Sequence, residues 1–122
     1  MKYFSFKEFD SPDKKGSGYL MDETFLSMLE DARHIAKIPF KINSGFRTKE
    51  YNQKLKKRGY KVSNNSSHLK GCAVDIHCND STSRFIIYNA LIDVGFNRIG
   101  VAKTFIHVDC DIDKHINKYW VY

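Results

Sequence analysis

The chain contains three residues whose side chains are good metal ligands, His68, Asp75 and His107. The first two lie in the segment SSHLKGCAVD, and the third lies in the segment FIHVD. Catalytic zinc usually has three protein ligands with nitrogen or oxygen donors and keeps a fourth position open for water. Two imidazoles and one carboxylate meet that need, so the sequence predicts that these three residues bind zinc.

Two predicted strands position these ligands, because each alternates between polar and apolar side chains. In the strand at residues 72–78, Asp75 lies on the polar face and the alternate positions are apolar. In the strand at residues 105–110, His107 shares the polar face with Asp109. The sequence therefore predicts one sheet face that carries the chemistry and an opposite face that belongs to the core.

Helices are predicted on either side of these strands. Apolar residues recur at three- and four-residue spacing between the N-cap Asp22 and Pro39, which indicates an amphipathic core helix. Two further helices are predicted at residues 48–58 and 81–95, the second with Ser81 as its cap. Because helices and strands do not alternate strictly, we expect an α+β fold with a small antiparallel sheet flanked by helices.

Shorter segments complete the predicted path of the chain. Short strands are predicted at residues 40–43 and 97–101, and residues 11–18 are predicted to form an ordered, turn-rich loop. Gly71 permits a sharp turn between the loop that carries His68 and the strand that follows it.

Length and composition indicate a single domain that spans residues 1–122. No apolar run approaches the ~20 residues of a membrane helix, so we expect no membrane partner. The N-terminus has no signal-peptide pattern. We also expect the protein to be a monomer. The three cysteines fall on predicted core faces and are expected to be buried, reduced thiols. Trp120 is expected to be a packing anchor rather than a surface that stacks on sugars.

The formal net charge of +6 implies attraction to polyanions such as nucleic acid, anionic lipid or bacterial cell-wall polymers. The densest basic run extends from Lys54 to Lys61, and the tyrosines beside it are compatible with nucleic-acid binding. We interpret this run as a solvated helix face and expect no nucleic-acid partner.

Three motifs occur in the order typical of the M15 peptidases: SGFR at residues 44–47, Ser-x-His-x-x-Gly-x-Ala-x-Asp at residues 66–75, and FIHVD at residues 105–109. The chain resembles the zinc D-Ala-D-Ala carboxypeptidase-like proteins, which share their fold with the hedgehog signalling domain. The resemblance implies zinc-dependent hydrolysis of peptide bonds in peptidoglycan stem peptides or cross-links, by a carboxypeptidase or an endopeptidase. Small members of this kind resemble bacteriophage endolysins, which would stay in the host cytoplasm until their release to the cell wall. A protein that is not phage-encoded would be cytoplasmic.

The resemblance also assigns roles to individual residues. His68, Asp75 and His107 would be the zinc ligands, and Arg47 and Ser66 would contact the substrate or support the transition state. Zinc lowers the pKa of a bound water from about 15.7 to near 7, and a guanidinium can hold a carboxylate or stabilise an oxyanion. For Ser66, a cap of its own loop is an equally good interpretation.

The general base is the role in which the chain departs from the resemblance. Many relatives have Glu or Asp three residues before the second histidine ligand, whereas this chain has Thr104, which cannot take a proton from water at neutral pH. Asp109 shares the face of His107, about 6 to 7 Å along the strand, and is the first candidate. It would serve equally well to orient a histidine ligand. His77, on the face of Asp75, is the second candidate.

Two other functions remain open from the sequence. The first is a zinc-bearing, non-catalytic module of the same fold that binds cell wall or protein, which the threonine at position 104 favours. The second is nucleic-acid binding around a structural zinc. A structural zinc normally has four protein ligands, often cysteines, and Cys72 and Cys110 point to the wrong face for that.

Overall fold

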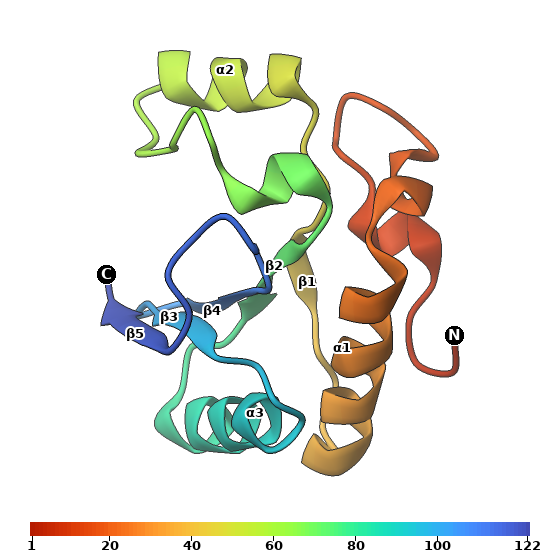
Figure 1. Cartoon of the computed structure of the whole chain (residues 1–122), viewed down its shortest axis with the longest axis vertical. Helices are drawn as coiled ribbons and strands as arrows, with labels where there is room; N and C mark the ends of the chain where they lie inside the picture. The colour runs from red at the N-terminus through yellow and green to blue at the C-terminus, as the bar shows by residue number, and fades with distance from the viewer.

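One five-stranded sheet organises the molecule, which the computed structural model describes from residue 1 to residue 122. The strands are β1 (Ile42–Ser44), β2 (Ala73–His77), β3 (Arg98–Val101), β4 (Phe105–Asp109) and β5 (Lys118–Val121). They lie in the order β1-β2-β4-β3-β5. Every pairing is antiparallel except that of β3 with β5, which is parallel (Figure 1).

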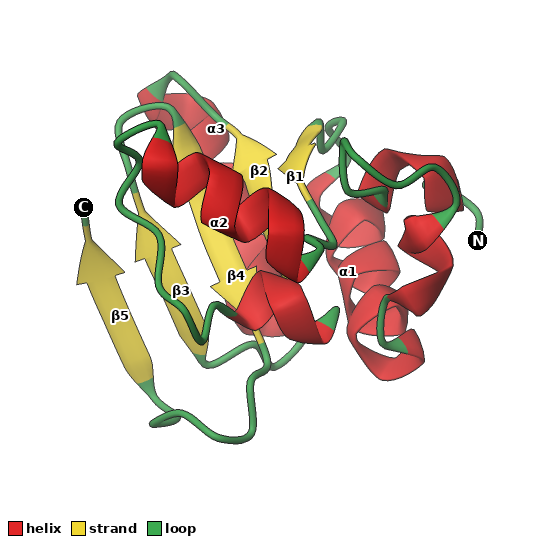
Figure 2. Ribbon diagram, turned by 90° about the horizontal axis from the view of Figure 1, so that it is seen from above, coloured by secondary structure: helices red, strands yellow, loops and turns green.

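Helices lie on both sides of this sheet. They are η1 (Phe6–Phe9), η2 (Ser17–Leu20), α1 (Glu23–Ala36), α2 (Lys49–Lys57), η3 (Ser67–Lys70) and α3 (Ser81–Asp93), where η marks a 3-10 helix. Both views show α3 on one side of the sheet and α2 on the other, with α1 beside α3 (Figure 1 and Figure 2). The predicted α+β class, an antiparallel sheet flanked by helices, is confirmed.

The helices begin at side chains that accept hydrogen bonds from otherwise unpaired backbone N–H groups. Asp22 caps α1 as predicted, with its carboxylate 2.8 Å from the N–H of Phe25. The prediction of Ser81 as the cap of α3 is wrong. Asp80 is the N-cap, and its carboxylate accepts a hydrogen bond from the N–H of Ser83 at 2.8 Å. A carboxylate also interacts favourably with the positive end of the helix dipole, which favours Asp80 over its neighbour.

The apolar face of the sheet forms the core with α1 and α3. The inward side chains of β2 and β4 are fully buried, and they are Val74, Ile76, Ile106 and Val108. They belong to one cluster with apolar side chains of both helices. The predicted alternation in these two strands is thus confirmed, and the polar side chains between them lie on the face that α2 overlooks.

The strand β5 is the one strand that the sequence pattern does not predict. The three 3-10 helices were not predicted either, and His68 lies in η3 where a loop was expected. The side chains of β5 are mostly exposed, and only Trp120 is partly buried. Parallel pairing with β3 sets Trp120 directly beside Gly100, where a Cβ atom would overlap the indole ring. Glycine therefore permits the close approach of Trp120 to the sheet.

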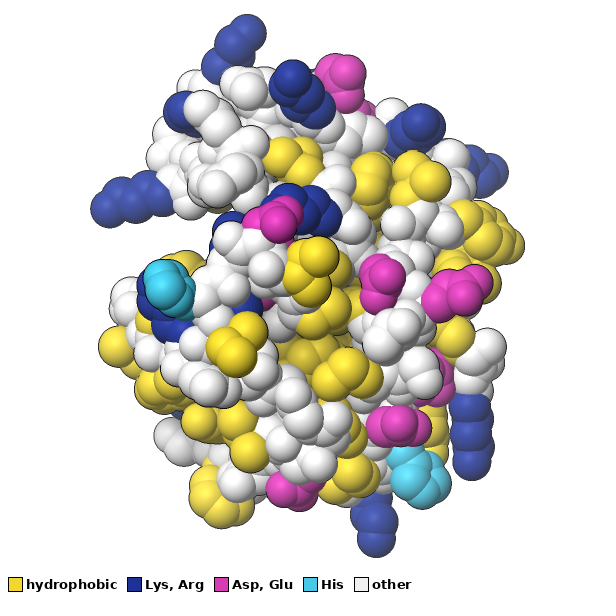
Figure 3. Space-filling model, in the orientation of Figure 1, with side chains coloured by type: hydrophobic (Ala, Val, Ile, Leu, Met, Phe, Trp, Pro, Cys, Tyr) yellow, Lys and Arg dark blue, Asp and Glu magenta, His cyan; other side chains and the backbone are white.

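The surface agrees with the interpretation of the basic run as a solvated helix face. The five basic side chains of residues 54–61 are all exposed, and Lys and Arg side chains project from the part of the surface that carries α2 (Figure 3). Cys72 and Cys78 are buried, Cys110 is partly buried, and all three are free thiols. No helix has the length and apolar character that crossing a membrane would require.

The contact between Gly100 and Trp120 predicts the effect of adding one methyl group. Gly100→Ala should lower the free energy of unfolding by about 1 to 3 kcal/mol, because the new Cβ must displace the indole ring. Denaturant unfolding followed by circular dichroism measures this change. In a Trp120→Ala background the same substitution should be nearly neutral. An equal cost in both backgrounds would show that the two residues do not constrain each other.

Candidate metal centre

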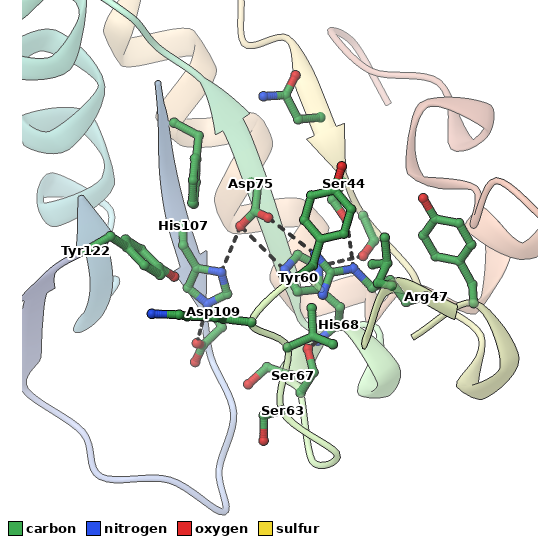
Figure 4. Close-up of a pocket in the computed structure, with 18 of the residues that line it drawn as sticks. Ser44, Arg47, Tyr60, Ser63, Ser67, His68, Asp75, His107, Asp109 and Tyr122 are labelled. Carbon is green, nitrogen blue, oxygen red and sulfur yellow. Dashed lines mark hydrogen bonds and ion pairs between the residues drawn. The ribbon is translucent and has the colours of Figure 1, made fainter. Parts of the chain in front are cut away.

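The three predicted ligands come together on the polar face of the sheet (Figure 4). One ligand atom from each of His68, Asp75 and His107 lies within 4.8 Å of the other two. Asp75 Oδ1 is 3.4 Å from His68 Nε2 and 2.9 Å from His107 Nδ1. The antiparallel register of β2 and β4 pairs Asp75 directly with His107, so strand pairing itself creates this contact.

The short helix η3 delivers His68 to this point. Ser66 is the N-cap of η3, and its Oγ accepts a hydrogen bond from the N–H of His68 at 3.3 Å. The Nδ1 of His68 donates to the carbonyl oxygen of Gly45 at 2.8 Å, which leaves Nε2 free to face the other two ligands. Gly71 ends η3 with φ 70°, and a Cβ there would lie 2.5 Å from the carbonyl oxygen of Leu20. The turn predicted at Gly71 therefore requires glycine.

A buried ion pair orients His107. The Nε2 of His107 is 2.7 Å from Asp109 Oδ2, and Arg98 Nε donates to Asp109 Oδ1 at 2.6 Å. Asp109 is only 1% exposed and also accepts a hydrogen bond from the backbone N–H of Asp111. With Nε2 engaged in this way, His107 presents Nδ1 to Asp75. Histidine ligands of metal ions commonly have a carboxylate on their second nitrogen.

Burial and hydrogen bonding give the two histidines opposite electrostatic character. Burial lowers the pKa of His68, which favours the neutral ring with a lone pair. Burial also disfavours charge on His107, but its hydrogen bonds with Asp109 and Asp75 prevail and raise its pKa. Although burial opposes ionisation of Asp75, hydrogen bonds from His107 and His68 hold its pKa well below the ordinary value. A metal ion bound to these atoms would take the place of a proton on His107.

The donor set fits a zinc ion. It offers two imidazole nitrogens and one ionised carboxylate, and the second nitrogen of each histidine already has an acceptor. No fourth His, Cys, Asp or Glu belongs to the cluster. Three protein ligands beside an open position are characteristic of catalytic zinc, whereas structural zinc is normally closed by four.

A cleft of about 730 Å³ opens over the three ligands. One wall comes from α2 and the loop that follows it, and the other comes from the β3, β4 and β5 side of the sheet. Figure 3 shows a notch in the outline of the molecule below the part that carries α2. Side chains from both walls face the ligands, among them Tyr60 from the loop and Tyr122 beyond β5 (Figure 4).

Arg47 and Ser66 also line this cleft. Arg47 Nε donates to the Oγ of Ser44 at 3.1 Å, and its terminal NH2 group lies 3.5 Å from Asp75 Oδ2. The Arg47 side chain is 12% exposed, and burial lowers its pKa from the ordinary value without threatening its charge. The Oγ of Ser66 caps η3, so the capping role weighed for this residue is present.

Thr104, which replaces the expected base, and the two candidates for the general base, Asp109 and His77, differ in position. Thr104 is exposed, and its carbonyl accepts a hydrogen bond from the N–H of Cys78. His77 is exposed at the end of β2 and does not line the cleft. Asp109 lines the cleft, but its two carboxylate oxygens are engaged by Arg98 and His107.

Sequence reasoning missed three residues of the site, namely Arg98, Trp120 and Tyr122. Arg98 is buried against Asp109, and its guanidinium lies 5.2 Å from the centroid of the Trp120 ring. Two signals were present in the predicted strand at residues 97–101. Alternation places Arg98 on the same face as Gly100, and a glycine inside a strand marks the close approach of another segment.

Comparison with known proteins places the chain in a family. A family model described as Peptidase M15 matches residues 2–109. The chain belongs to the M15 peptidase family. The crystal structure of the Serratia marcescens L-Ala D-Glu endopeptidase ChiX is similar to this structure, with a TM-score of 0.63 and 16% sequence identity. The similarity covers 78% of this chain and 84% of that chain. No curated protein sequence matches this chain significantly.

The matched region of this M15 peptidase contains the three candidate ligands together with Arg47 and Ser66. Residues 110–122 lie beyond the match and include β5, which supplies Trp120 to the cleft. Part of one wall of the site thus comes from a segment that the family model does not describe.

The single tryptophan of the chain allows metal binding to be measured without an enzyme assay. The Trp120 ring centroid is 5.6 Å from that of His107, so Co²⁺ bound at the cluster should quench Trp120 fluorescence. Quenching should saturate at one ion per chain and weaken as the pH falls, because the proton on His107 competes with the metal.

His68→Ala should abolish this saturable quenching, whereas His77→Ala, which alters an exposed histidine of the neighbouring strand β2, should leave it unchanged. Quenching that persists in His68→Ala with unchanged affinity would contradict the assignment of the site.

Proposed function

We propose that this M15 peptidase is a zinc-dependent hydrolase of peptide bonds in peptidoglycan, with His68, Asp75 and His107 as the zinc ligands. The observation that carries the proposal is the convergence of three ligand atoms within 4.8 Å of one another in the floor of an open cleft. Membership of a peptidase family supports hydrolysis of peptide bonds. The shared fold of ChiX, an L-Ala D-Glu endopeptidase, supports peptidoglycan as the source of the substrate.

The residues of the cleft suit a hydrolytic role. Zinc held by the three ligands would supply a water that ionises near pH 7, and the ion would polarise the scissile carbonyl. Arg47 lies beside Asp75 with its charge directed into the cleft, where it can hold a substrate carboxylate or oppose negative charge that develops on the carbonyl oxygen. The net charge of +6 favours approach to an anionic cell wall.

We further propose that cleavage is internal to the stem peptide. The lining of the cleft extends beyond the three ligands and includes Asp10 and Pro12 of the N-terminal segment and Lys114 and Tyr122 near the C-terminus. Tyr122 and Arg47 lie on opposite sides of the ligands (Figure 4). A terminal D-alanine would need a pocket closed on one side, whereas an internal bond needs room on both sides. This arrangement therefore favours an endopeptidase over a carboxypeptidase.

For Asp109 we propose the role of a positioning residue. Arg98 and His107 occupy its carboxylate oxygens, and the side chain is buried under the ring of His107 rather than free to meet a water in the cleft. It therefore fixes the orientation of His107 and does not take the proton of the attacking water.

The absence of a free carboxylate in the cleft to act as general base is the feature that favours the second candidate function, a zinc-bearing module that binds cell wall without cleaving it.

Digestion of purified peptidoglycan distinguishes these two functions. The protein loaded with zinc should release soluble stem-peptide fragments that mass spectrometry identifies, and an excess of chelator should stop the release. Asp75→Asn should reduce the rate by at least about 10³-fold because it weakens the ligand set. His77→Ala provides the matched control and should retain full activity.

Binding to peptidoglycan without any chelator-sensitive product, tested on walls of several chemical types, would favour the non-catalytic module. A product that consists of free D-alanine alone would instead show a carboxypeptidase.

A second substitution tests the role of Asp109. Asp109→Asn should weaken zinc binding by about 10- to 100-fold, because His107 loses the acceptor that holds its ring. At saturating zinc, the acidic limb of the pH profile of kcat/KM should persist. Asp113→Asn is the control, because Asp113 has an exposed side chain in the loop after β4. It should change neither the zinc affinity nor the pH profile of kcat/KM. A variant with normal zinc affinity and no acidic limb would identify Asp109 as the general base instead.

A further inference from the structure

The segment beyond the family match brings a phenol to the candidate metal centre. Along β5 and the residue after it, Trp120 and Tyr122 line the cleft, whereas Tyr119 points away and stacks on Tyr88 of α3 at 5.2 Å between ring centroids. Figure 4 shows the Tyr122 ring on the His107 side of the ligands, with its oxygen directed toward them. Strand alternation therefore gives this segment one tyrosine in the site and one outside it.

Several contacts hold the Tyr122 ring in that position. The backbone N–H of Tyr122 donates to the carbonyl oxygen of Val101 at 3.1 Å. The ring lies 5.1 Å from the Phe105 ring and 6.4 Å from the Trp120 ring, measured between centroids. Trp120 in turn packs on His107. Tyr122 is thus positioned by both the sheet and the aromatic side chains around the ligands.

The hydrogen-bonding state of Tyr122 leaves its proton available. The neighbouring side chain is Trp120, whose indole N–H can only donate, so a hydrogen bond between these two side chains would leave the phenol proton free. No acceptor in the protein lies within hydrogen-bond distance of the Tyr122 O–H. Tyr122 is 68% exposed. An ordinary phenol has a pKa of about 10 and is protonated at neutral pH, and partial desolvation in the cleft raises the pKa of Tyr122 further.

The donor on the other side of the ligands is partly engaged within the protein. Arg47, on the opposite side of the ligands from Tyr122, is held by Ser44 and Asp75 (Figure 4). Hydrolysis of an amide places negative charge on the carbonyl oxygen, and catalysis requires a donor that is already oriented toward that charge. The uncommitted O–H of Tyr122 meets this requirement from the side of His107.

We propose that Tyr122 is a catalytic residue whose phenol donates a hydrogen bond to the carbonyl oxygen of the scissile amide as negative charge develops on it. The proton stays on the phenol, and no bond to Tyr122 is made or broken. This role rests on the proposed hydrolytic function, and it gives the unmatched C-terminal segment a part in the chemistry.

Two single-atom deletions on neighbouring side chains test the role. Tyr122→Phe removes only the hydroxyl and keeps the ring contacts, so folding and zinc stoichiometry should be unchanged. With a soluble stem peptide as substrate, its kcat should fall by about 10²-fold at an unchanged KM. Tyr119→Phe, the matched control on the outer face of β5, should keep the kcat of the unmodified protein.

Binding of a tetrahedral analogue provides a readout that does not depend on turnover. A phosphinate analogue of the L-Ala–D-Glu dipeptide imitates the oxyanion, and calorimetry on the zinc-loaded protein should show it binding about 10²-fold more weakly to Tyr122→Phe. Tyr119→Phe should bind it normally. Failure of the unmodified protein to hydrolyse any stem peptide would overturn the proposed function, and the phosphinate comparison would still decide the role of Tyr122.

Three results would overturn the catalytic role of Tyr122. One is a kcat within about twofold of the unmodified protein. Another is a rise in KM alone, which would make Tyr122 a wall of the binding cleft. The third is equal binding of the phosphinate to Tyr122→Phe and to the unmodified protein, including no binding to either.

Discussion

The carboxylate of Asp75 is the group on which the arrangement of the cleft depends. The side chain of Asp75 lies in the floor of the cleft and is only 15% exposed, so its charge needs partners, because an ionised carboxylate withdrawn from water is costly. Its partners come from three separate parts of the chain: His68 from η3, His107 from β4 and Arg47 from the loop before α2. Each of these side chains in turn has a hydrogen-bond acceptor on its far side, which is Gly45, Asp109 and Ser44 respectively. The contacts of Asp75 thus connect η3 and the loop before α2 to the sheet.

The sheet supplies the rigidity that such a site needs, and the C-terminal segment supplies part of its wall. On one face β2 and β4 contribute buried aliphatic side chains to the core, and on the other face the same two strands present Asp75 and His107. Next to them, the Arg98–Asp109 ion pair holds His107, and Trp120 packs over Arg98 and Gly100. The core and the candidate centre therefore share their strands, and β5 closes one side of the cleft.

Patterns between residues close in the sequence were sufficient to predict the two central strands, the faces of their side chains and the turn at Gly71. Strand alternation correctly placed Asp75 with His107 and Asp109, and the Gly71 turn followed from the need for a positive φ. The cap of α3 was misplaced by one residue because Asp80 and Ser81 are both good N-cap types. β5 escaped prediction because an exposed edge strand has little apolar alternation and pairs with β3 over a long sequence separation. The roles of Trp120 and Tyr122 depend on that pairing, which no local pattern reveals. Arg98 pairs with Asp109 across β3 and β4, and the alternation of Arg98 with Gly100 was a local signal for its place on this face.

The central claim is that His68, Asp75 and His107 bind one zinc ion and leave a position open to the cleft. Anomalous diffraction at the zinc absorption edge, from crystals of the zinc-loaded protein, tests it most directly. The account predicts one zinc peak per chain, bonded to His68 Nε2, an oxygen of Asp75 and His107 Nδ1, with a solvent molecule as the remaining ligand. A zinc ion closed by four protein ligands, one bound through His107 Nε2, or no peak at these residues would contradict it.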